Sequence, residues 1–273
     1  MILQKQKNLI TKEVKQLTAH NLATEVEITR IENKKRLVIT DLTAREVELT
    51  ILINNSKTLL LKCSPGNYKF LAIGFLFANG IITKKEDIIS IKTGKNIVNI
   101  ELNKKLIPVE NLINPNLSIS ALKSKIDKKL NKANKRQERI IKSDVIFTLL
   151  ARMQEKAYFF NKTGGVHNCG LADREGCLLL YCEDVSRYNT IDRIFGEALL
   201  KNISMKDKIL LTSCRITSGI MEKIINGGIT TIASRSAVTD SAAKLANRKN
   251  ITLIGFARDN RMNIYSCSDN VVD

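Results

Sequence analysis

The chain contains no tryptophan, and all aromatic residues together make up only 5% of its 273 residues. Its core is therefore expected to be aliphatic, built mainly on isoleucine, leucine and valine. The hydrophobic fraction of 44% is typical of a globular protein and not of a disordered one. A chain of this length has room for one large domain or two smaller ones.

Long apolar runs are also missing. The most apolar stretch, FLAIGFLFANGII, is too short and too interrupted by glycine to span a bilayer. The opening residues MILQKQKNLI have no long apolar segment behind their lysines, which argues against a signal peptide. None of the six cysteines forms a Cys-x-x-Cys pair, and in a chain this size they fit reduced thiols better than disulfides. We therefore expect a cytoplasmic protein with no membrane partner.

Acidic residues are few, 27 against 44 lysines and arginines, which gives a net charge of +17. Residues 123–142 alone hold nine lysines and arginines against two acidic residues. This segment is either a surface for nucleic acid or an acidic partner protein, or a solvated basic helix or linker. No aromatic side chain interrupts it to stack on bases, so we expect no nucleic-acid partner.

The first half of the chain carries strand and helix signals between residues 45 and 102. The runs VELTILINN and TLLLKCS predict a hairpin, SPGNYKFLAIGFLFANG predicts a helix, and NIVNIEL predicts another strand. We expect an N-terminal extension over residues 1–44, a small α+β domain over 45–102 and a basic mobile inter-domain segment over 103–142.

The second half, residues 143–273, alternates between strand and helix patterns. SDVIFTLLARMQEKAYFF predicts a helix, and CLLLYC, KILLTS, ITTIAS and ITLIGFA predict buried strands with helices between them. This alternation predicts an α/β domain with a largely parallel sheet, to which RMNIYSC adds an antiparallel strand. In such folds ligands bind at the carboxyl ends of the strands.

Two groups of residues are candidates for that site. The first is TGGVH, in which the backbone of Thr163, Gly164 and Gly165 is suited to cradling an anion, and His167 to carrying a proton. A tight turn and a structural histidine are the alternatives. The second group consists of polar residues that follow the predicted strands: Glu183, Asp184, Arg187, Asn189, Asp192, Arg215, Ser234 and Arg235.

Arginines at three strand ends are the strongest physical signal. Arg187, Arg215 and Arg235 each follow a predicted strand and open a predicted helix. Guanidinium groups beside helix N-termini bind phosphate well, so the pattern predicts a phosphorylated or nucleotide-like ligand. Helix capping is the alternative for Asn189 and Asp192.

These motifs together resemble one known family. TGGVHNCGL, CEDVSRYNTIDRIFG, TSCRITSGIMEK, IASRSAVTDSAAKLA and ITLIGFARDNRMNIY follow the order and spacing of the FdhD family of formate dehydrogenase accessory sulfurtransferases. The resemblance implies a cytidine-deaminase-like three-layer α/β domain preceded by the smaller α+β domain. It also implies that sulfur passes from a cysteine desulfurase to the bis-molybdopterin guanine dinucleotide molybdenum cofactor, bound as a substrate, for formate dehydrogenase.

The resemblance further places part of the cofactor site on one turn after a strand: Phe256, Ala257, Arg258, Asp259, Asn260 and Arg261. It implies no tightly bound metal. Whether the protein forms a homodimer is left open.

The sequence departs from this family at the residues that carry sulfur. The family uses a Cys-x-x-Cys pair between its domains, whereas this chain has no cysteine between Cys63 and Cys169. Ser118 and Ser120 stand about where the pair belongs, and serine cannot form a persulfide. The alternatives are a relay moved to Cys169 or Cys214, or a degenerate paralogue that only binds the molybdenum cofactor or a guanine nucleotide. Arg215 is expected to lower the pKa of Cys214.

A zinc deaminase, which shares this type of fold, is a further alternative. That chemistry needs His-x-Glu and Pro-Cys-x-x-Cys, whereas the chain offers only His-Asn-Cys at residues 167–169, so we set it aside.

Overall fold

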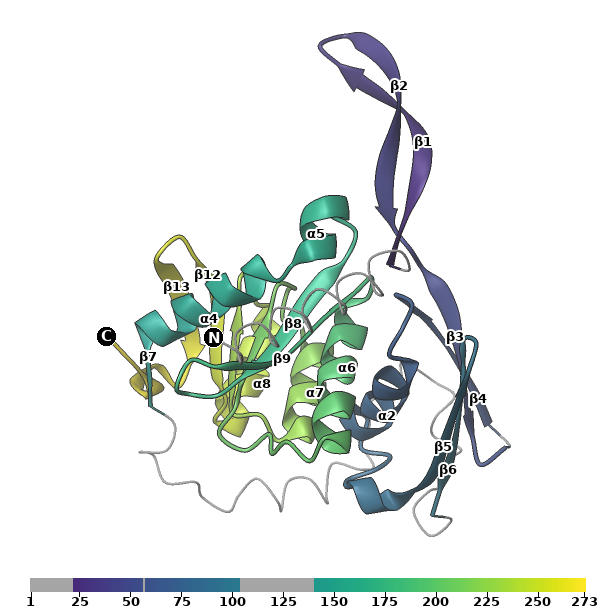
Figure 1. Cartoon of the computed structure of the whole chain (residues 1–273). Coiled ribbons are helices and arrows are strands. Elements are labelled where there is room, and N and C mark those ends of the chain that lie inside the picture. The colour runs from purple at the N-terminus through teal and green to yellow at the C-terminus, as the bar shows by residue number, and fades with distance from the viewer. Residues whose placement is uncertain (1–21, 56, 104–139) are drawn as a thin grey trace, which may run out of the picture.

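The computed structural model describes residues 22–55, 57–103 and 140–273, in which two larger sheets lie beside each other (Figure 1). The predictions for Ser118, Ser120 and nearly all of the basic segment fall outside the described residues. No helix in the described part of the chain is long and apolar enough to cross a membrane.

A two-stranded ribbon precedes the larger sheets. It consists of β1 (Ala23–Glu32) and β2 (Lys35–Ala44), which pair antiparallel over their full length. Asn33 and Lys34 both have positive φ, as the tightest hairpin turns require. The ribbon extends away from the body of the molecule, and β2 contacts α5 (Tyr158–Thr163) near its base (Figure 1). Neither strand of this ribbon was predicted from the sequence.

The first larger sheet has the strand order β4-β3-β6-β5 and packs against one helix. Its elements are β3 (Val47–Ile53), β4 (Lys57–Cys63), α2 (Tyr68–Ala78), a short 3-10 helix (Lys85–Asp87), β5 (Ile88–Gly94) and β6 (Ile97–Leu102). The predicted hairpin, helix and NIVNIEL strand are confirmed, and β5 was not predicted. Asn54 and Asn55 supply the two left-handed residues that turn the hairpin.

The second sheet has six strands in the order β13-β12-β11-β10-β8-β9. Its strands are β8 (His167–Ala172), β9 (Leu178–Asp184), β10 (Ile209–Thr212), β11 (Thr231–Ser234), β12 (Thr252–Arg258) and β13 (Arg261–Ser266). Its helices are α4 (Ser143–Glu155), α6 (Arg187–Leu200), α7 (Ser218–Gly227) and α8 (Asp240–Lys249). A small parallel pair, β7 (Ile141–Lys142) with β14 (Val271–Val272), ties the C-terminal residues to the start of α4.

The prediction of a largely parallel sheet is wrong, because only the β10–β11 and β11–β12 pairs are parallel and the other three are antiparallel. A parallel connection needs a crossover of a dozen residues or more. The turns from β8 to β9 and from β12 to β13 are far shorter, so these strands form hairpins. The predicted antiparallel pairing of the RMNIYSC strand is confirmed.

Helices cover both faces of the six-stranded sheet (Figure 1). Leu210, Ile232 and Leu253 pack into the cluster formed with α6, α7 and α8. The next residue along each of these strands points to the opposite face and packs with α4. The alternating buried residues therefore make three layers, with α4 and α5 on one side and the other helices behind the sheet.

The two larger sheets are joined by a close crossing of α2 and α6. Gly74 of α2 and Gly196 of α6 face each other, and a Cβ on Gly74 would overlap the carbonyl oxygen of Asp192. A Cβ on Gly196 would likewise overlap the carbonyl oxygen of Phe70. Backbone therefore packs directly on backbone, which only glycine permits.

Replacing Gly196→Ala should separate this crossing and lower stability. Overpacking of this kind typically costs about 1–3 kcal/mol, and more where backbone cannot move aside. The free energy of unfolding, measured in urea, checks this. Glu222→Ala, at an exposed position of α7, is the control and should change stability by less than ~0.5 kcal/mol. Equal stability of the two variants would show that the crossing is loosely packed.

Candidate functional site

The carboxyl ends of β9, β10, β11 and β12 meet at one edge of the six-stranded sheet. These strands run in the same direction, because β8 is antiparallel to both β9 and β10. Arg187 and Arg215 follow β9 and β10 at this edge, Arg235 follows β11, and Arg258 ends β12. The structure therefore brings the predicted arginine-bearing strand ends together along one rim.

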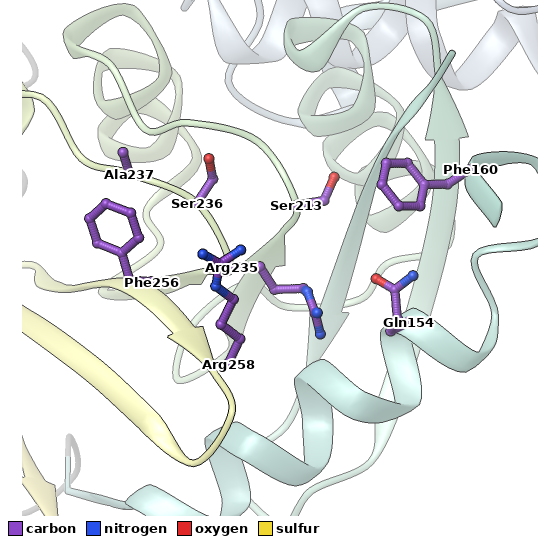
Figure 2. A pocket seen from close by; sticks show the side chains of 8 residues that line it. All are labelled: Gln154, Phe160, Ser213, Arg235, Ser236, Ala237, Phe256 and Arg258. Atoms are coloured by element: carbon purple, nitrogen blue, oxygen red, sulfur yellow. The ribbon is translucent and has the colours of Figure 1, made fainter. Parts of the chain in front are cut away.

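A pocket of about 370 Å³ opens at this rim. Its lining residues are Gln154, Phe160, Ser213, Arg235, Ser236, Ala237, Phe256 and Arg258. Figure 2 shows Arg235 in the middle of the pocket, with Phe160 and Gln154 on one side and Phe256 and Arg258 on the other. Two guanidinium groups and two hydroxyl groups in one cavity are the donors that bind phosphate oxygens.

The loops that carry these side chains are held by their own hydrogen bonds. The amide of Arg235 donates to Thr212 O at 3.1 Å, and Ser234 Oγ donates to Cys214 O at 2.7 Å. Phe256 N donates to Ser236 O at 2.9 Å. The buried hydroxyl of Ser234 therefore holds the loop after β10 and is not available to a ligand. These hydrogen bonds within the chain fix the rim.

Phe256 adopts a left-handed backbone conformation with φ 51°. For a bulky residue this conformation is uncommon and costs free energy, and such residues concentrate at functional sites. It lies within the irregular pairing between Gly255 and Arg258, which turns the aromatic ring into the pocket.

The rest of the predicted stretch from Phe256 to Arg261 is divided between core and turn. Ala257 is buried in the α4 cluster, whereas Asp259 and Asn260 form the exposed left-handed turn between β12 and β13. Arg261 pairs with Arg258 across this hairpin. Arg258 also lies 3.8 Å from the Asp259 carboxylate, with both side chains largely exposed.

His167, Arg187 and Arg215 form a second group at the same edge. Partial burial lowers the pKa of His167, and the charges of Arg187 and Arg215 lower it further. Asp184 opposes the shift without reversing it. His167 is therefore a neutral imidazole at pH 7, able to accept and to donate one hydrogen bond.

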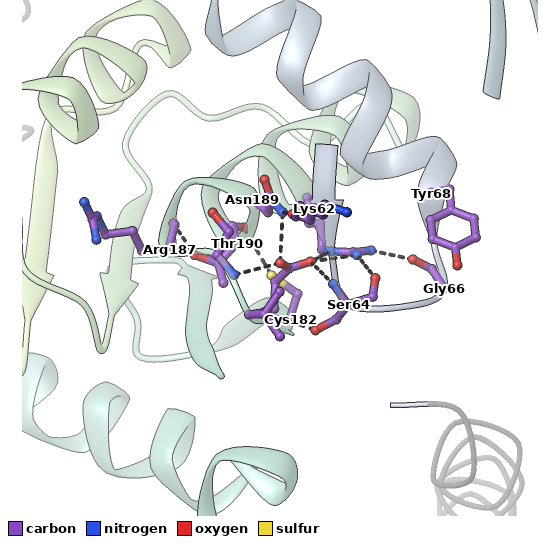
Figure 3. A network of polar contacts seen from close by, with 12 residues as sticks. Lys62, Ser64, Gly66, Tyr68, Cys182, Arg187, Asn189 and Thr190 are labelled. Carbon is purple, nitrogen blue, oxygen red and sulfur yellow. Dashed lines mark hydrogen bonds and ion pairs between the residues drawn. The ribbon is translucent and has the colours of Figure 1, made fainter. Parts of the chain in front are cut away.

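Three acidic and amide residues predicted for the site face the protein interior instead. Asp184 is fully buried and accepts hydrogen bonds from Ser186 N, Asn189 Nδ2 and Arg193 Nε, at 2.8–2.9 Å. Figure 3 labels Asn189 in this network. Asn189 Nδ2 also donates to Lys62 O. Asp192 is buried in an ion pair with Lys223 Nζ at 2.8 Å, which joins α6 to α7.

The glycine pair and Glu183 belong to the two ends of α5. Gly164 N donates to Phe160 O and Gly165 N donates to Thr163 Oγ1, so these amides are already bonded within the chain. Gly164 has φ 62° and ends the helix, as glycine commonly does. At the other end, Glu183 accepts from Phe159 N and Phe160 N at 3.2 and 2.8 Å. The anion-cradling geometry expected of the pair is not present.

The cysteines near the rim are buried. Cys214 is 2% exposed and Cys169 is fully buried, and burial raises the pKa of both thiols. The expectation that Arg215 lowers the pKa of Cys214 is therefore wrong, because desolvation outweighs the hydrogen bond with Thr212 and the charge of Arg187, which act in the opposite direction. The exposed Cys177 lies in the β8–β9 turn, at the opposite end of these strands.

Several pocket residues were not identified from the sequence. Gln154 and Phe160 reach the pocket from α4 and α5, which cross over the sheet, so no local pattern marks them. Ser213 directly follows β10 and Ser236 lies two residues after β11, and these positions were a usable signal. Across the described ranges, no group of three His, Cys, Asp or Glu residues is placed to hold a metal ion.

The fold and the rim define a mixed α/β protein with a basic pocket at the carboxyl edge of its larger sheet. Residues 44–272 match the model of the FdhD/NarQ family, and the chain belongs to this family. The predicted family resemblance is confirmed.

Similar proteins cover nearly the whole chain. The sulfur carrier protein FdhD of Staphylococcus aureus (strain MRSA252) is 33% identical, over 90% of this chain and 95% of its own length. That of Shouchella clausii (strain KSM-K16) is 32% identical, over 92% and 97%. A crystal structure from Desulfotalea psychrophila, described as a formate dehydrogenase accessory protein, superposes with a TM-score of 0.75 at 23% identity. It covers 92% of this chain and 100% of its own, and it shares the fold.

The lowered pKa of His167 predicts a loss of stability in mild acid. The unfolded chain, with an ordinary histidine pKa near 6.5, binds this proton more readily than the folded protein. Stability should therefore fall as the pH drops through that value. The melting temperature of His167→Gln should fall less between pH 7.5 and pH 5.5 than that of the unmodified protein. An equal fall would mean that His167 protonates freely in the folded state.

Proposed function

We propose that the protein is an accessory protein for formate dehydrogenase maturation that binds the bis-molybdopterin guanine dinucleotide molybdenum cofactor as cargo. The observation that carries this proposal is the pocket in which Arg235, Arg258, Ser213 and Ser236 converge. Family membership supports the accessory role.

The side chains at the rim fit a diphosphate. Arginine offers several N–H donors in a planar fork that matches phosphate oxygens, and the serine hydroxyls add further donors. Arg187 Nε is buried without a hydrogen-bond partner among the described residues, so this edge holds a donor that the protein itself does not satisfy. Arg235 and Arg258 would hold the phosphates, and the neutral His167 would accept or donate one hydrogen bond beside them.

The finer features implied by the family resemblance are also part of the proposal. The three-layer unit of residues 143–273 is cytidine-deaminase-like, and residues 45–102 form a separate smaller domain. Formate dehydrogenase is the partner that receives the cofactor. A cysteine desulfurase is a partner only if a thiol of this chain accepts sulfur, and a homodimer is compatible with one pocket in each copy.

Sulfur transfer and cofactor binding are separable functions, and the cysteines favour binding alone. A persulfide forms on an accessible thiolate, whereas the thiols beside the rim are buried with raised pKa values. All six cysteines of the chain lie in its described part. We therefore propose that the chain binds the cofactor without carrying sulfur on Cys169 or Cys214.

Binding of GDP tests the pocket. Isothermal titration calorimetry should detect binding to the unmodified protein, weakening as salt is added. Arg235→Ala should weaken it roughly 10- to 100-fold, because a hydrogen bond to a charged group contributes about 1.5–3 kcal/mol. Arg258→Ala should have a similar effect. Arg248→Ala, at an exposed position of α8, is the matched control and should leave the affinity unchanged. Loss of binding in all three would point to nonspecific charge attraction.

Incubation with a cysteine desulfurase and cysteine tests the absence of a relay. Intact mass spectrometry should find no added sulfur on Cys169 or Cys214, because their thiols are protonated and inaccessible. A family member that carries the Cys-x-x-Cys pair is the positive control. Sulfur localised to either buried cysteine would restore sulfur transfer as the function.

A further inference from the structure

Asn168 is a buried polar residue that the proposed phosphate contacts do not use. Its side chain is fully buried in β8. Neither Oδ1 nor Nδ2 has a hydrogen-bond partner among the described residues. A buried carboxamide without hydrogen-bond partners has lost its hydration with nothing in return, so a residue of this kind requires an explanation. Its backbone, by contrast, is well held, since the amide donates to Ser213 Oγ at 3.0 Å.

Asn168 is joined by its backbone to a residue that lines the pocket. Asn168 is opposite Glu183 in the β8–β9 register, and on its other side its backbone bonds to Ser213, which lines the pocket. Its neighbour Cys169 packs with α6–α8, so alternation along the strand turns Asn168 toward α4 and α5. Phe160 lines the same pocket, and its backbone amide donates a hydrogen bond to Glu183.

Glu183 keeps hydrogen-bonding capacity on this side. Each of its carboxylate oxygens accepts one amide of α5, from Phe159 or Phe160, and the Tyr181 hydroxyl is a further donor beside them. Because each carboxylate oxygen has two lone pairs, acceptor capacity remains. The half-buried Phe160 is thus bonded to Glu183, whose register partner Asn168 offers an unused donor and an unused acceptor.

We propose that Asn168 and Glu183 form a subsite for the 2-amino-4-oxopyrimidine edge that guanine and pterins share, reached when the Phe160 ring moves aside. That edge presents a carbonyl acceptor next to ring and amino N–H donors. Asn168 Nδ2 would donate to the carbonyl, and the carboxylate of Glu183 would accept the N–H groups. The displaced aromatic ring can then stack on the heterocycle. This inference rests on the proposed function, whose phosphate contacts are at Arg235 and Arg258.

The orientation of a nucleotide follows from this placement. Along the rim, Arg258 and Arg235 come first, then Ser213, and then Asn168 with Glu183, in the order of strands β12, β11, β10, β8 and β9. A diphosphate bound to the arginines therefore directs its base toward β8. Inorganic pyrophosphate, which has no base, would contact only the phosphate-binding part of the site at Arg235 and Arg258.

Asn168→Leu tests the subsite with four probes: pyrophosphate, GDP, 6-hydroxymethylpterin diphosphate and ADP. The variant should bind pyrophosphate and ADP as the unmodified protein does, and bind GDP or the pterin diphosphate roughly tenfold more weakly. Loss confined to GDP identifies guanine as the recognised group, and loss confined to the pterin identifies the pterin. Asn263→Leu, at an exposed position of β13, is the matched control.

The outcomes separate this inference from the proposed function. If the unmodified protein binds neither pyrophosphate nor GDP, the phosphate pocket itself is refuted. If both bind and Asn168→Leu only raises the melting temperature without changing any affinity, Asn168 is structural and the inference is overturned. Equal affinity of the unmodified protein for ADP and GDP would also overturn it.

The absence of tryptophan allows an independent measurement of the ring movement. Phe160→Trp introduces a single fluorophore at the proposed gate, and Phe256→Trp introduces one at the opposite wall of the pocket. GDP should shift the emission of the Phe160→Trp variant more than pyrophosphate does, because only a base displaces the ring. The Phe256→Trp variant should not discriminate between the two. Identical responses of the Phe160→Trp variant to both ligands would overturn the gate.

Discussion

The buried carboxylate of Asp184 holds three segments of the chain in one place. It accepts hydrogen bonds from the start of α6 and pairs with Arg193 further along that helix, at 2.8 Å. It also accepts from Ser64 N, and Arg193 donates to Ser64 O in the loop after β4. A charge without water is tolerated only when paired and hydrogen-bonded, and breaking such a pair costs about 3–5 kcal/mol. The end of β9, the start of α6 and the first sheet are therefore fixed together.

This interaction also positions the rim. Arg187 lies three residues after Asp184 and is the first residue of α6, so the same network that anchors the helix places its guanidinium close enough to His167 to lower the histidine pKa. The close crossing of α2 and α6 at Gly74 and Gly196 also packs the first larger sheet, through α2, against the same helix. The buried contacts of α6 with Asp184 and with α2 thus hold Arg187 in the position from which it lowers the pKa of His167.

Local sequence patterns predicted the strands β9–β12, the helices between them and the placement of arginines at strand ends. They did not predict the antiparallel β8–β9 pairing, the ribbon of β1 and β2, or the contribution of Gln154 and Phe160 to the pocket. A charge at a strand end shows where a residue lies along the chain but not to which face its side chain turns. For that reason Asp184 and Arg187, three residues apart, were both predicted as ligand contacts although Asp184 is committed to the interior.

Phosphate binding and sulfur transfer impose different physical requirements, which this chain meets unequally. Phosphate binding needs fixed positive charges in a partly dry cavity, and the pocket presents Arg235 from the hydrogen-bonded loop after β11 and Arg258 from the end of β12. Sulfur transfer needs a thiolate that is accessible and has a moderate pKa, whereas burial in the aliphatic core gives the rim cysteines the opposite character. The side chains that line the pocket include no cysteine, so the geometry of the pocket does not require a thiol. The proposed cargo site therefore does not depend on a sulfur-carrying cysteine in the pocket.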